Sequence, residues 1–379
     1  MPSFFLLFLA LIFSQTLATN SFAESSLATP IPLTDDLNYT GLETALEKSR
    51  DFFDTAAEQI FNLCGQSLSG LELSRAYSQI LNRLADKENK DLDLFFSENF
   101  TSCRPTSLLV TGYYTPIFPG SLTPSDRYRF PLYTPPDQEQ LRCLSRAEID
   151  TDTPLKGHEI AYLADPLDLF FLHVQGSGII QLPDGSRRLA AYAANNGRPY
   201  TSIGRVLIQE GLLQKEEVSL ASIRNYLNGH PEQRDRILHH NERYIFFRLN
   251  TPEPGKILPT GSLGCPLTPG RSVAMDASHY PPGILGVLTS SRPVLNKNSK
   301  VAWQPFTRLV THQDSGAAIE GAHRLDLYMG VGRKAGGKAG VMKEKGRFAI
   351  LIPNLSLRRV RSKIVSSENI GQQPKEPAH

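Results

Sequence analysis

The spacing of hydrophobic residues changes along the chain, and these changes limit the folds that it can adopt. Between residues 41 and 101, and again between 201 and 240, apolar residues recur every three or four positions, which predicts amphipathic helices. From Ser107 the pattern becomes strand-like, because Leu108 to Tyr114 is rich in β-forming residues and Pro116 ends the run. At 379 residues the chain is also long for one hydrophobic core, so we expect about two domains.

Further strands are expected where short apolar runs meet turn residues. In order, the sequence predicts strands at Phe170 to Gly178 and Ile179 to Leu182, a tight turn at Pro183 to Gly185, a returning strand at Arg188 to Ala194, and another strand at Tyr244 to Phe247. From Gly261 to Pro353 we expect short strands separated by glycine-rich turns, with no helix of ordinary length. The chain therefore combines helical and β-rich parts.

The first 23 residues form a separate unit. Phe4 to Phe13 is an unbroken apolar run of ten residues, which is short for a membrane span and typical of a signal-peptide core. Small residues at Ser21 and Ala23 suit a signal peptidase, so we expect cleavage after Ala23. A basic segment before the run is missing, since the first Lys or Arg is Lys48, and no cysteine near the run offers a lipid attachment site. We expect export without a lipid anchor.

The charge balance excludes one class of function. A net charge of +2 argues against binding of nucleic acid through its phosphates, which requires a basic surface. The densest basic run, Arg358 to Lys363, borders a polar tail and is interpreted as a solvated end of the chain. We therefore expect no nucleic-acid partner.

The four cysteines lie far apart in the sequence. They are Cys64, Cys103, Cys143 and Cys265, and no two of them form a C-x-x-C pair, so the sequence predicts no zinc site. Four cysteines in a chain of this length cannot form a disulfide scaffold. Buried free thiols are the simpler interpretation, and one disulfide stays open for an exported protein.

Polar and apolar residues alternate near the C-terminal end of the chain. On a strand, Leu325 and Leu327 would point to one face. Arg324, Asp326 and Tyr328 would point to the other face, which places a carboxylate between a cation and a phenol. This mixture suits a polar polyhydroxy ligand. Taken alone, Asp326 is more simply interpreted as a surface or ion-paired aspartate.

Three other segments offer ligand contacts, and each also has a simpler structural interpretation. Asp314 precedes a turn of small residues, where a carboxylate often caps backbone N–H groups. Thr111 to Tyr114 holds adjacent tyrosines beside a glycine, and their faces could stack on sugar rings or lie partly in the core. Gln175 to Gly178 places an amide and a hydroxyl beside glycines, which either admit a ligand to the backbone or form a β-bulge.

Taken together, these segments resemble the membrane-bound lytic murein transglycosylase A family and its C-terminal module, which is named for three aspartates. The matching segments are Leu109 to Pro116, Phe171 to Gly178, Asn195 to Gly204, Asn241 to Arg248, Pro266 to Pro269 and Asp314 to Gly330. Each motif alone is weak, but all six occur in the family's order. The similarity runs from about residue 107 to residue 355, which is most of the mature chain.

The resemblance implies a mainly β fold with α-helices. Its larger part is a six-stranded double-psi β-barrel domain with N-terminal helices, and a smaller β domain is inserted into it across a groove. On this basis we place a signal peptide at 1–23, the barrel domain at 24–116 and 256–365, the inserted domain at 117–255 and a disordered tail at 366–379.

The resemblance also implies the residues of the site. The three aspartates of the module fall on Asp276, Asp314 and Asp326, and the family's catalytic acid corresponds to Asp326. We expect catalytic roles for Asp326 and Asp314, and substrate contacts from Thr111, Gly112, Tyr113, Tyr114, Gln175, Gly176, Ser177, Gly178 and Arg324. This chain has His173 where some members carry an aspartate, and it lacks the family's lipid-bearing cysteine. No essential carboxylate is therefore required at position 173, and no metal or cofactor is expected.

The mechanism implied by the resemblance needs one carboxyl group, because the attacking group belongs to the substrate. Asp326 would protonate the oxygen between N-acetylmuramic acid and N-acetylglucosamine. It would then take the proton of the muramyl C6 hydroxyl as that oxygen closes onto C1. A carboxyl group that donates a proton at neutral pH must be kept protonated, which a desolvated groove and the like charge of Asp314 would favour. We therefore expect Arg324 to contact Asp314 or the glycan rather than Asp326.

Two other interpretations stay open. An inverting glycoside hydrolase on a similar barrel would need a second essential carboxylate, with Asp276 or Asp314 as candidates. A non-catalytic glycan-binding wall protein would keep the tyrosines and glycines and could lose Asp326. In the main interpretation the partner is peptidoglycan, acted on by a monomer in the periplasm. An association with the outer membrane or with wall-synthesis proteins is compatible with the sequence.

Overall fold

The computed structural model describes residues 34–86, 91–152, 154–251, 258–295 and 301–354 of the chain. The predicted signal peptide at 1–23, the basic run from Arg358 to Lys363 and the predicted tail at 366–379 lie outside the described residues. Within the described part of the chain, no helix is both long enough and apolar enough to cross a membrane.

The N-terminal part is helical, with a small hairpin that the sequence did not predict. It comprises α1 (Leu42–Thr55), β1 (Ile60–Leu63), β2 (Gln66–Ser69), α2 (Gly70–Ala85) and α3 (Leu92–Asn99). The helical spacing predicted between residues 41 and 101 is confirmed for these three helices. α2 begins at a reciprocal cap, in which the Ser69 hydroxyl accepts from the N–H of Glu72 and the Glu72 carboxylate accepts from the N–H of Ser69.

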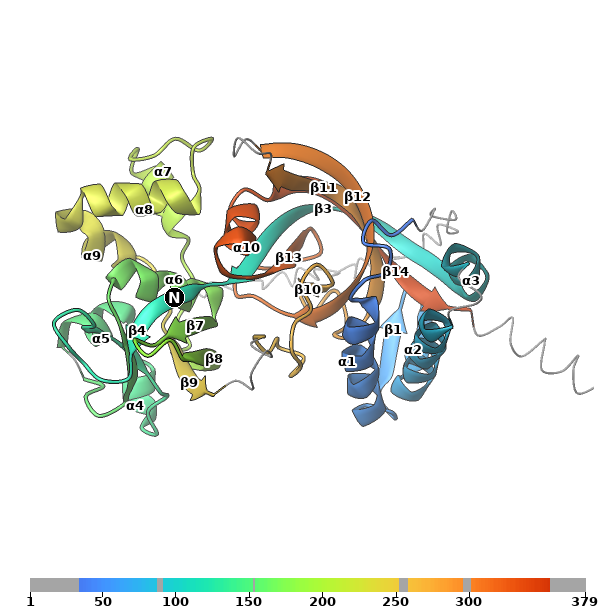
Figure 1. Ribbon diagram of the computed structural model, residues 1–379, viewed down its shortest axis with the longest axis horizontal. Coiled ribbons are helices and arrows are strands. Elements are labelled where there is room, and N and C mark those ends of the chain that lie inside the picture. Colours follow the sequence, from blue (N-terminus) through green and yellow to red (C-terminus); the bar gives the residue numbers. More distant parts are fainter. Residues whose placement is uncertain (1–33, 87–90, 153, 252–257, 296–300, 355–379) are drawn as a thin grey trace, which may run out of the picture.

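Six strands close into a barrel in the order β10-β12-β11-β14-β3-β13. They are β3 (Phe100–Thr115), β10 (Ser272–Ala274), β11 (Leu285–Leu295), β12 (Val301–Asp314), β13 (Arg324–Val331) and β14 (Lys343–Pro353), with α10 (Gly332–Ala339) before the last strand. β3 pairs with β13, and β10 with β12, in parallel, while the other pairs are antiparallel. The predicted six-stranded barrel is confirmed, and Figure 1 shows α1, α2 and α3 on one side of it.

The barrel strands are longer than the short ones predicted between Gly261 and Pro353. β11 has 11 residues, β12 has 14 and β14 has 11. They are long because β11 and β12 pair along their whole length as one hairpin, and β14 continues along β3. The short helix α10 was not predicted, because the glycines in its sequence lower the helix propensity.

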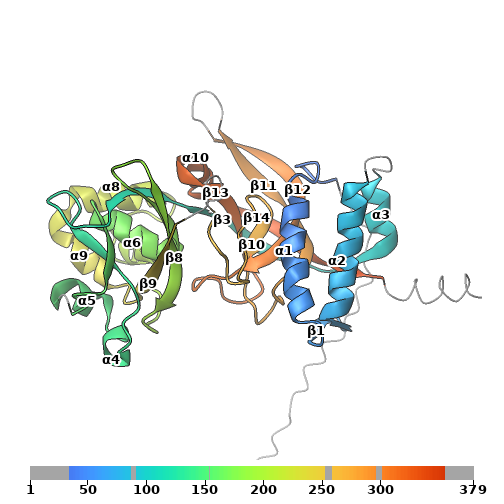
Figure 2. The ribbon, with the colours of Figure 1, turned by 60° about the horizontal axis from the view of Figure 1, so that its bottom comes forward.

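The chain between β3 and β10 forms a second unit around a six-stranded sheet with the order β5-β6-β4-β7-β8-β9. Its strands are β4 (Ile117–Ser121), β5 (Phe130–Tyr133), β6 (Glu159–Leu163), β7 (Gly178–Gln181), β8 (Arg187–Asn195) and β9 (Ile245–Asn250). Its helices are α4 (Glu139–Arg142), α5 (Arg146–Asp152), α6 (Pro166–Gln175), α7 (Ile203–Gln209), α8 (Leu220–Gly229) and α9 (Pro231–His239). Figures 1 and 2 show this unit beside the barrel, on the opposite side from α1 and α2. The domain bounds proposed from the sequence stay a prediction.

The strand predicted from Phe170 to Gly178 is wrong, because most of this segment belongs to helix α6. Asp165 accepts a hydrogen bond from the N–H of Leu167, Pro166 lies in the first turn, and Gly176 ends the helix with a φ of 73°. Six of the ten residues in the helix are buried. A helix that is apolar on nearly all sides shows no helical spacing in its sequence, so its apolar run was mistaken for a buried strand.

One disulfide joins the N-terminal hairpin to the barrel. Cys64 lies in the turn between β1 and β2, and it is bonded to Cys103 of β3. Cys143 is exposed and Cys265 is buried, and both are free. The interpretation of the cysteines as free thiols is therefore wrong for Cys64 and Cys103. The two lie 39 residues apart, so nothing in the sequence indicates that they pair.

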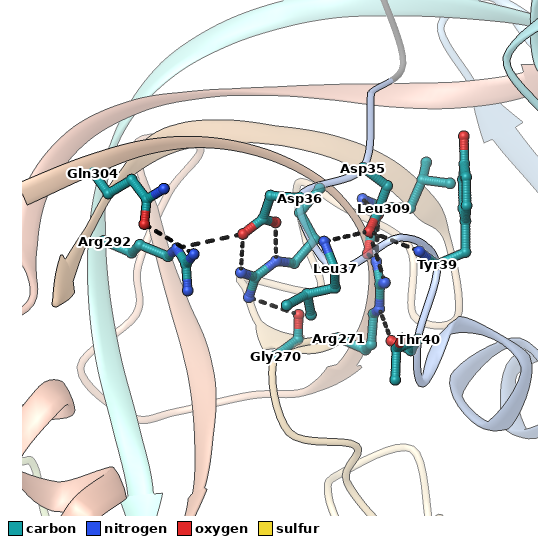
Figure 3. A network of polar contacts seen from close by, with 11 residues as sticks. Asp35, Asp36, Leu37, Tyr39, Thr40, Gly270, Arg271, Arg292, Gln304 and Leu309 are labelled. Carbon is teal, nitrogen blue, oxygen red and sulfur yellow. Dashed lines mark hydrogen bonds and ion pairs between the residues drawn. The ribbon is translucent and has the colours of Figure 1, made fainter.

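A buried ion pair fastens the segment before α1 to the barrel (Figure 3). The Arg271 guanidinium donates to the two carboxylate oxygens of Asp35, at 2.5 and 2.8 Å, and to the carbonyl oxygen of Leu309. The Asp35 carboxylate also accepts from three backbone N–H groups. Beside it, Arg308 donates to both carboxylate oxygens of Asp36. Because Arg271 immediately precedes β10, the ion pair fixes the strand that lies between β12 and β13.

We predict that Asp35→Asn lowers the free energy of unfolding by about 3–5 kcal/mol, because it leaves a fully buried arginine without its counter-ion. Burial alone would raise the pKa of Asp35, but the hydrogen bonds and charge of Arg271, together with backbone N–H groups, outweigh it and lower the pKa. The stabilisation is therefore complete above the unfolded-state value of 3.8, and it is lost as the pH falls below that value towards the folded-state pKa.

Urea unfolding of the wild type and the variant, from about pH 7 down to about pH 3, measures both effects. Asp51→Asn, which breaks an exposed pair with Arg50, is the control and should change the stability far less. An Asp35→Asn protein as stable as this control would contradict the role of the buried pair.

Candidate active site

Four neighbouring strands bring the candidate residues to one face of the barrel. β10 lies between β12 and β13, and its Ala274 is paired with Asp314 on one side and with Asp326 on the other. On the far side of β13, Asp326 is paired with Thr111 of β3. Side chains that are paired across strands point to the same face. We call Asp314, Ala274, Asp326 and Thr111 the aspartate row.

The aspartate row faces away from the barrel core. Leu325 and Leu327, which flank Asp326 on β13, are buried in that core. The side chain of Asp326 is 14 % exposed, so the predicted alternation of this strand is confirmed. Tyr328 is fully buried, and its hydroxyl lies 2.8 Å from that of Thr115. It therefore packs beside the aspartate row and is not accessible to a ligand.

Asp326 is ion-paired in this structure. Nε of Arg324 donates to Oδ1 of Asp326 at 2.9 Å, and Nη2 donates to Oδ2 at 3.1 Å. The Thr111 hydroxyl also donates to Oδ1. The expectation that Arg324 contacts Asp314 or the glycan rather than Asp326 is therefore wrong for the protein without substrate. The two residues lie two positions apart on one strand and share a face, where the planar guanidinium fits a carboxylate with two hydrogen bonds.

The ion pair has a chemical consequence. Because Arg324 donates to both carboxylate oxygens of Asp326, this contact has to be released before the carboxyl group can exchange a proton with a ligand. Nη1 of Arg324 donates to the carbonyl oxygen of Ala318 at 2.8 Å, and the Arg324 side chain is 33 % exposed. A polar ligand can therefore draw the guanidinium away from Asp326 without burying an unpaired cation.

Asp314 lies at the end of β12 and is more enclosed. Its Oδ1 accepts from the N–H groups of Ser262 at 3.0 Å and Ser315 at 2.9 Å, and its Oδ2 accepts from the Tyr113 hydroxyl at 2.9 Å. Burial raises the pKa of Asp314, the negative charge of Asp326 adds to the rise, and the three hydrogen bonds only partly offset it. Asp314 thus combines the backbone capping predicted from its turn with an electrostatic contact to Asp326.

Asp276 has a different environment. Its Oδ1 accepts from the N–H and the hydroxyl of Ser278, at 2.9 and 2.6 Å, and its Oδ2 accepts from the N–H of Gly321 at 2.6 Å. Hydrogen bonds from Ser278, and then from Gly321, lower the pKa of Asp276 to about 2. A carboxylate this acidic is a weak base and no acid at neutral pH. It ties the loop after β10 to the turn before β13.

The two predicted tyrosines lie in different surroundings. Tyr113 packs against Tyr328, with ring centres 5.2 Å apart, and its hydroxyl donates to Asp314. Burial, followed by the charge of Asp314, raises the pKa of Tyr113 well above its usual value. The Tyr114 ring lies against α10, where a Cβ atom at Gly336 would come within 2.7 Å of it. Tyr113 therefore binds a member of the aspartate row through its hydroxyl. Tyr114 packs against α10 instead.

The predicted glycines serve packing more than access to the backbone. A Cβ atom at Gly112 would lie 2.9 Å from Ala339 of α10, and one at Gly178 would lie 2.5 Å from Leu172 of α6. Gly176 has open space around it and provides the left-handed end of α6. The close packing at positions 112 and 178 accounts for these glycines without a ligand.

Gln175 and Ser177 lie where the second unit meets the barrel. Oε1 of Gln175 accepts from the N–H of Tyr114 at 3.4 Å, which links the end of α6 to β3. Ser177 is half-buried, and its hydroxyl has no hydrogen-bond partner among the described residues. One turn earlier, His173 is buried against Tyr244, and burial followed by the charge of Arg146 lowers its pKa well below the usual value. His173 therefore belongs to the core of the second unit and not to the aspartate row.

One residue that was not selected from the sequence also reaches the site. Tyr200 lies in the second unit, just before α7. Burial raises the pKa of Tyr200, and the phenol is close enough to Arg324 and Asp326 for their charges to act on it. It lies within the Asn195 to Gly204 segment on which part of the resemblance depends, and an aromatic residue in that segment was the available signal. The site therefore draws on both units.

Together, this face offers two carboxylates, a guanidinium, the hydroxyl of Thr111 and the phenol of Tyr113, and the charges of Arg324 and Asp326 act on the phenol of Tyr200 in the second unit. Such groups can exchange protons and bind the hydroxyls of a polar ligand. In the part of the chain that the structure describes, no three His, Cys, Asp or Glu side chains gather closely enough to hold a metal ion. The arrangement suits acid–base chemistry on a polyhydroxy substrate.

We predict that Tyr113→Phe raises the pKa of Asp314 further, because it removes a hydroxyl that stabilises the carboxylate. An NMR titration of the Asp314 carboxyl carbon measures the change. Tyr328→Phe is the matched control, since the hydroxyl it removes contacts Thr115 and not an aspartate, and it should move the titration much less. An unchanged midpoint in Tyr113→Phe would show that the phenol does not bind this carboxylate.

Two family models match the sequence. One is described as the MltA specific insert domain and matches residues 109–248, and the other is described as the 3D domain and matches residues 271–352. Among curated proteins, the chain is similar to the membrane-bound lytic murein transglycosylase A of Escherichia coli K12, with 37 % identity over 243 residues, and of Vibrio cholerae, with 35 % over 244 residues. Each match covers 64 % of this chain and 64 % of the relative, so less than two thirds of the relatives' length is matched.

Solved structures resemble both units. The structure of Escherichia coli MltA with bound chitohexaose gives a TM-score of 0.69 at 27 % identity, over 86 % of this chain and 92 % of that one. A membrane-bound lytic murein transglycosylase from Agrobacterium tumefaciens gives 0.68 at 27 % identity, over 85 % and 95 %. A lytic transglycosylase of Burkholderia pseudomallei is 34 % identical over 84 % of this chain and 91 % of that one, with a TM-score of 0.54.

Proposed function

The chain belongs to the family of the membrane-bound lytic murein transglycosylase A, and from this premise we propose that it cleaves the glycan strands of peptidoglycan. The bond broken is the β-1,4 bond between N-acetylmuramic acid and N-acetylglucosamine, and the new end is a 1,6-anhydromuramyl ring. One observation carries the proposal. Asp326 lies on the outer face of the barrel beside Thr111 and Arg324, and its side chain is 14 % exposed. A solved relative holds bound chitohexaose, which supports a glycan substrate.

The reaction needs one carboxyl group, because the substrate supplies the attacking oxygen. In its protonated form, Asp326 donates a proton to the glycosidic oxygen, and the bond from that oxygen to C1 of the muramyl residue breaks. The C6 hydroxyl of the same residue attacks C1 and gives its proton to the Asp326 carboxylate. The proton returns to its starting point, no water is consumed, and these steps require no metal or cofactor.

Arg324 decides when Asp326 can act as an acid. Without substrate, the guanidinium of Arg324 donates to both oxygens of Asp326. A glycan that draws the guanidinium towards its own oxygens removes this counter-ion and excludes water from the site. Asp326 is then left beside Asp314, whose charge already interacts with it. Both changes favour protonation of Asp326.

We propose that groups from both units hold the glycan around Asp326. Tyr200 brings a phenol from the second unit close to Arg324, and Ser177 offers a hydroxyl with no partner in the described chain. Gln175 holds the end of α6 against β3, which keeps these groups in place. We assign Tyr200 and Ser177 to substrate binding and Gln175 to positioning.

An inverting glycoside hydrolase is the alternative chemistry, and it needs a second carboxylate to activate a water molecule. Asp276 has a pKa of about 2 and accepts three hydrogen bonds from other parts of the protein. Asp314 shares the face of Asp326, but three donors already bind it, which leaves little capacity to orient a water. The mechanism with one carboxyl group therefore accounts better for these contacts.

We place this activity in the periplasm, because peptidoglycan lies there and the sequence predicts a signal peptide at residues 1–23. An association with the outer membrane or with wall-synthesis proteins, and the monomeric state, stay predictions. The segment that would carry a lipid anchor lies outside the described residues.

We predict that the muropeptides released by the protein end in 1,6-anhydromuramic acid. Ring closure by the C6 hydroxyl replaces attack by water, so each product is lighter by one water molecule than the product of hydrolysis. Mass spectrometry of digested sacculi, with and without borohydride reduction, distinguishes the two ends because the anhydro end is not reduced. Free reducing ends throughout would make the protein a hydrolase.

We predict that Asp326→Asn abolishes cleavage while glycan binding is largely retained. The amide is nearly isosteric, but it cannot deliver a proton to the bridging oxygen or accept one from the C6 hydroxyl. General acid–base assistance is worth about 10² to 10⁴ in rate, and since one group serves both half-steps we expect a loss of about 10⁴ or more. Turnover and binding of a defined glycan, measured separately, test this.

Two further variants rank the roles. Asp314→Asn should lose less activity than Asp326→Asn, through the altered charge beside Asp326 and a weaker turn. His173→Ala should lose still less per folded molecule, because its ring lies in the core of the second unit. If Asp326→Asn kept most of its turnover while His173→Ala lost it, the assignment of the catalytic residue would be wrong even with the family correct.

A further inference from the structure

Three cations alternate with other residues along β14. Lys343, Lys345 and Arg347 are exposed, and the residues between them are buried or half-buried. None of the three forms an ion pair with another residue in the ranges that the structure describes. We call them the β14 basic strip. Alternate residues on a strand lie about 7 Å apart, so these like charges repel one another.

The strand register places the β14 basic strip on the same face as Asp326. Lys343 is paired with Thr111, which is paired with Asp326, so the aspartate row continues directly to Lys343. The next row along the strands joins Lys345 to Arg324 in the same way. Neighbouring strands lie about 4.8 Å apart, so the backbone of Lys343 is about 10 Å from that of Asp326.

The strip is a local feature of a nearly neutral protein, since the net charge of the chain is +2. Charges in water are screened within about 8–10 Å at physiological salt, so a ligand that neutralises the strip has to lie against it. Repulsion among the three cations is relieved when carboxylates or phosphates bind between them. The strip therefore suits an anionic ligand at the edge of the site.

We propose that the β14 basic strip binds the carboxylates of the peptide side chains that peptidoglycan carries on its muramyl residues. The proposal rests on the function proposed above. These peptides contain acidic residues and free carboxyl ends, and three extended residues span about 10 Å, the separation between Asp326 and Lys343. The lysine ammonium groups and the Arg347 guanidinium bind carboxylates through charge-assisted hydrogen bonds. The enzyme thus selects strands that carry their acidic peptides.

The position of the strip favours the substrate over a membrane surface as its partner. The rows that hold Lys343 and Lys345 also hold Asp326 and Arg324, so an occupant of the strip lies beside the bond that is cleaved. A flat bilayer that reached Lys343 would also cover Asp326 and exclude the glycan. A flexible peptide on the substrate meets both groups at once.

The test compares two substrates and three forms of the full-length protein. The substrates are purified glycan strands with intact peptides and the same strands with their carboxyl groups converted to methylamides. The proteins are the wild type, the strip variant Lys343→Gln/Lys345→Gln/Arg347→Gln, and the control Arg75→Gln/Lys156→Gln/Lys215→Gln. The control removes three charges from exposed positions outside the strip, so it matches the change in net charge.

We expect kcat/KM of the wild type and the control to fall about tenfold when the substrate carboxylates are neutralised, which is the sum expected for a few exposed charge pairs. The strip variant should lose the same factor on native strands and show no further loss on the methylamide strands. The change should appear mainly in KM, because the peptide contacts are equal before and during bond cleavage.

The outcomes separate this proposal from the one on which it rests. If the wild type cleaves neither substrate, the proposed function has failed. If the wild type cleaves both at similar rates, or the strip variant still distinguishes them, the inference is overturned while the proposed function stands. If the strip variant keeps its preference but no longer binds vesicles containing anionic phospholipid, the strip is a membrane-binding surface and the inference is also overturned.

Discussion

Parallel pairing of β3 with β13 is the interaction on which the rest of the structure depends. It joins Thr111 to Asp326 across 215 positions of the sequence, so the second unit and three other barrel strands lie between the two partners. Closing such a long loop costs conformational entropy, which the burial of Leu325 and Leu327 in the barrel core offsets. The same pairing places Asp326 on the outer face. The strand pairing that packs the barrel core therefore also positions the site.

The three aspartates are the same residue type, but their hydrogen-bond partners and burial differ, and these differences give them different chemical properties. Asp276 is surrounded by donors and is strongly acidic, which suits a connection between loops. Asp314 is enclosed and has a raised pKa, and it places a second negative charge near Asp326. Asp326 is partly buried and is the one of the three that is paired with an arginine in the described chain, and Arg324 has a second acceptor at Ala318. This difference suits Asp326 to the proposed reaction, since a carboxyl group that acts first as an acid and then as a base needs a counter-ion that can move away.

Much of this arrangement could be predicted from the sequence, where local spacing decides the structure. The alternation from Arg324 to Tyr328 indicated a strand with Asp326 on its polar face, and the helical spacing before Ser107 indicated α1 and α2. The helix α6 could not be read in this way, because burial on nearly all sides removed its spacing.

The other features that the sequence did not predict depend on tertiary structure. The pairing of Arg324 with Asp326 depends on side-chain geometry on one strand, and the approach of Tyr200 depends on how the second unit lies beside the barrel. The Cys64–Cys103 bond likewise depends on where the β1–β2 turn meets β3. Sequence spacing carries none of this information.

The central claim is that the attacking oxygen belongs to the substrate, so that Asp326 needs no second carboxylate. A synthetic glycan whose muramyl residue carries hydrogen in place of the C6 hydroxyl tests it directly. The account predicts that the protein binds this glycan about as well as the natural one but does not cleave it, because no group is left to close onto C1. Cleavage at a rate close to that of the natural glycan, with release of a free reducing end, would contradict the account.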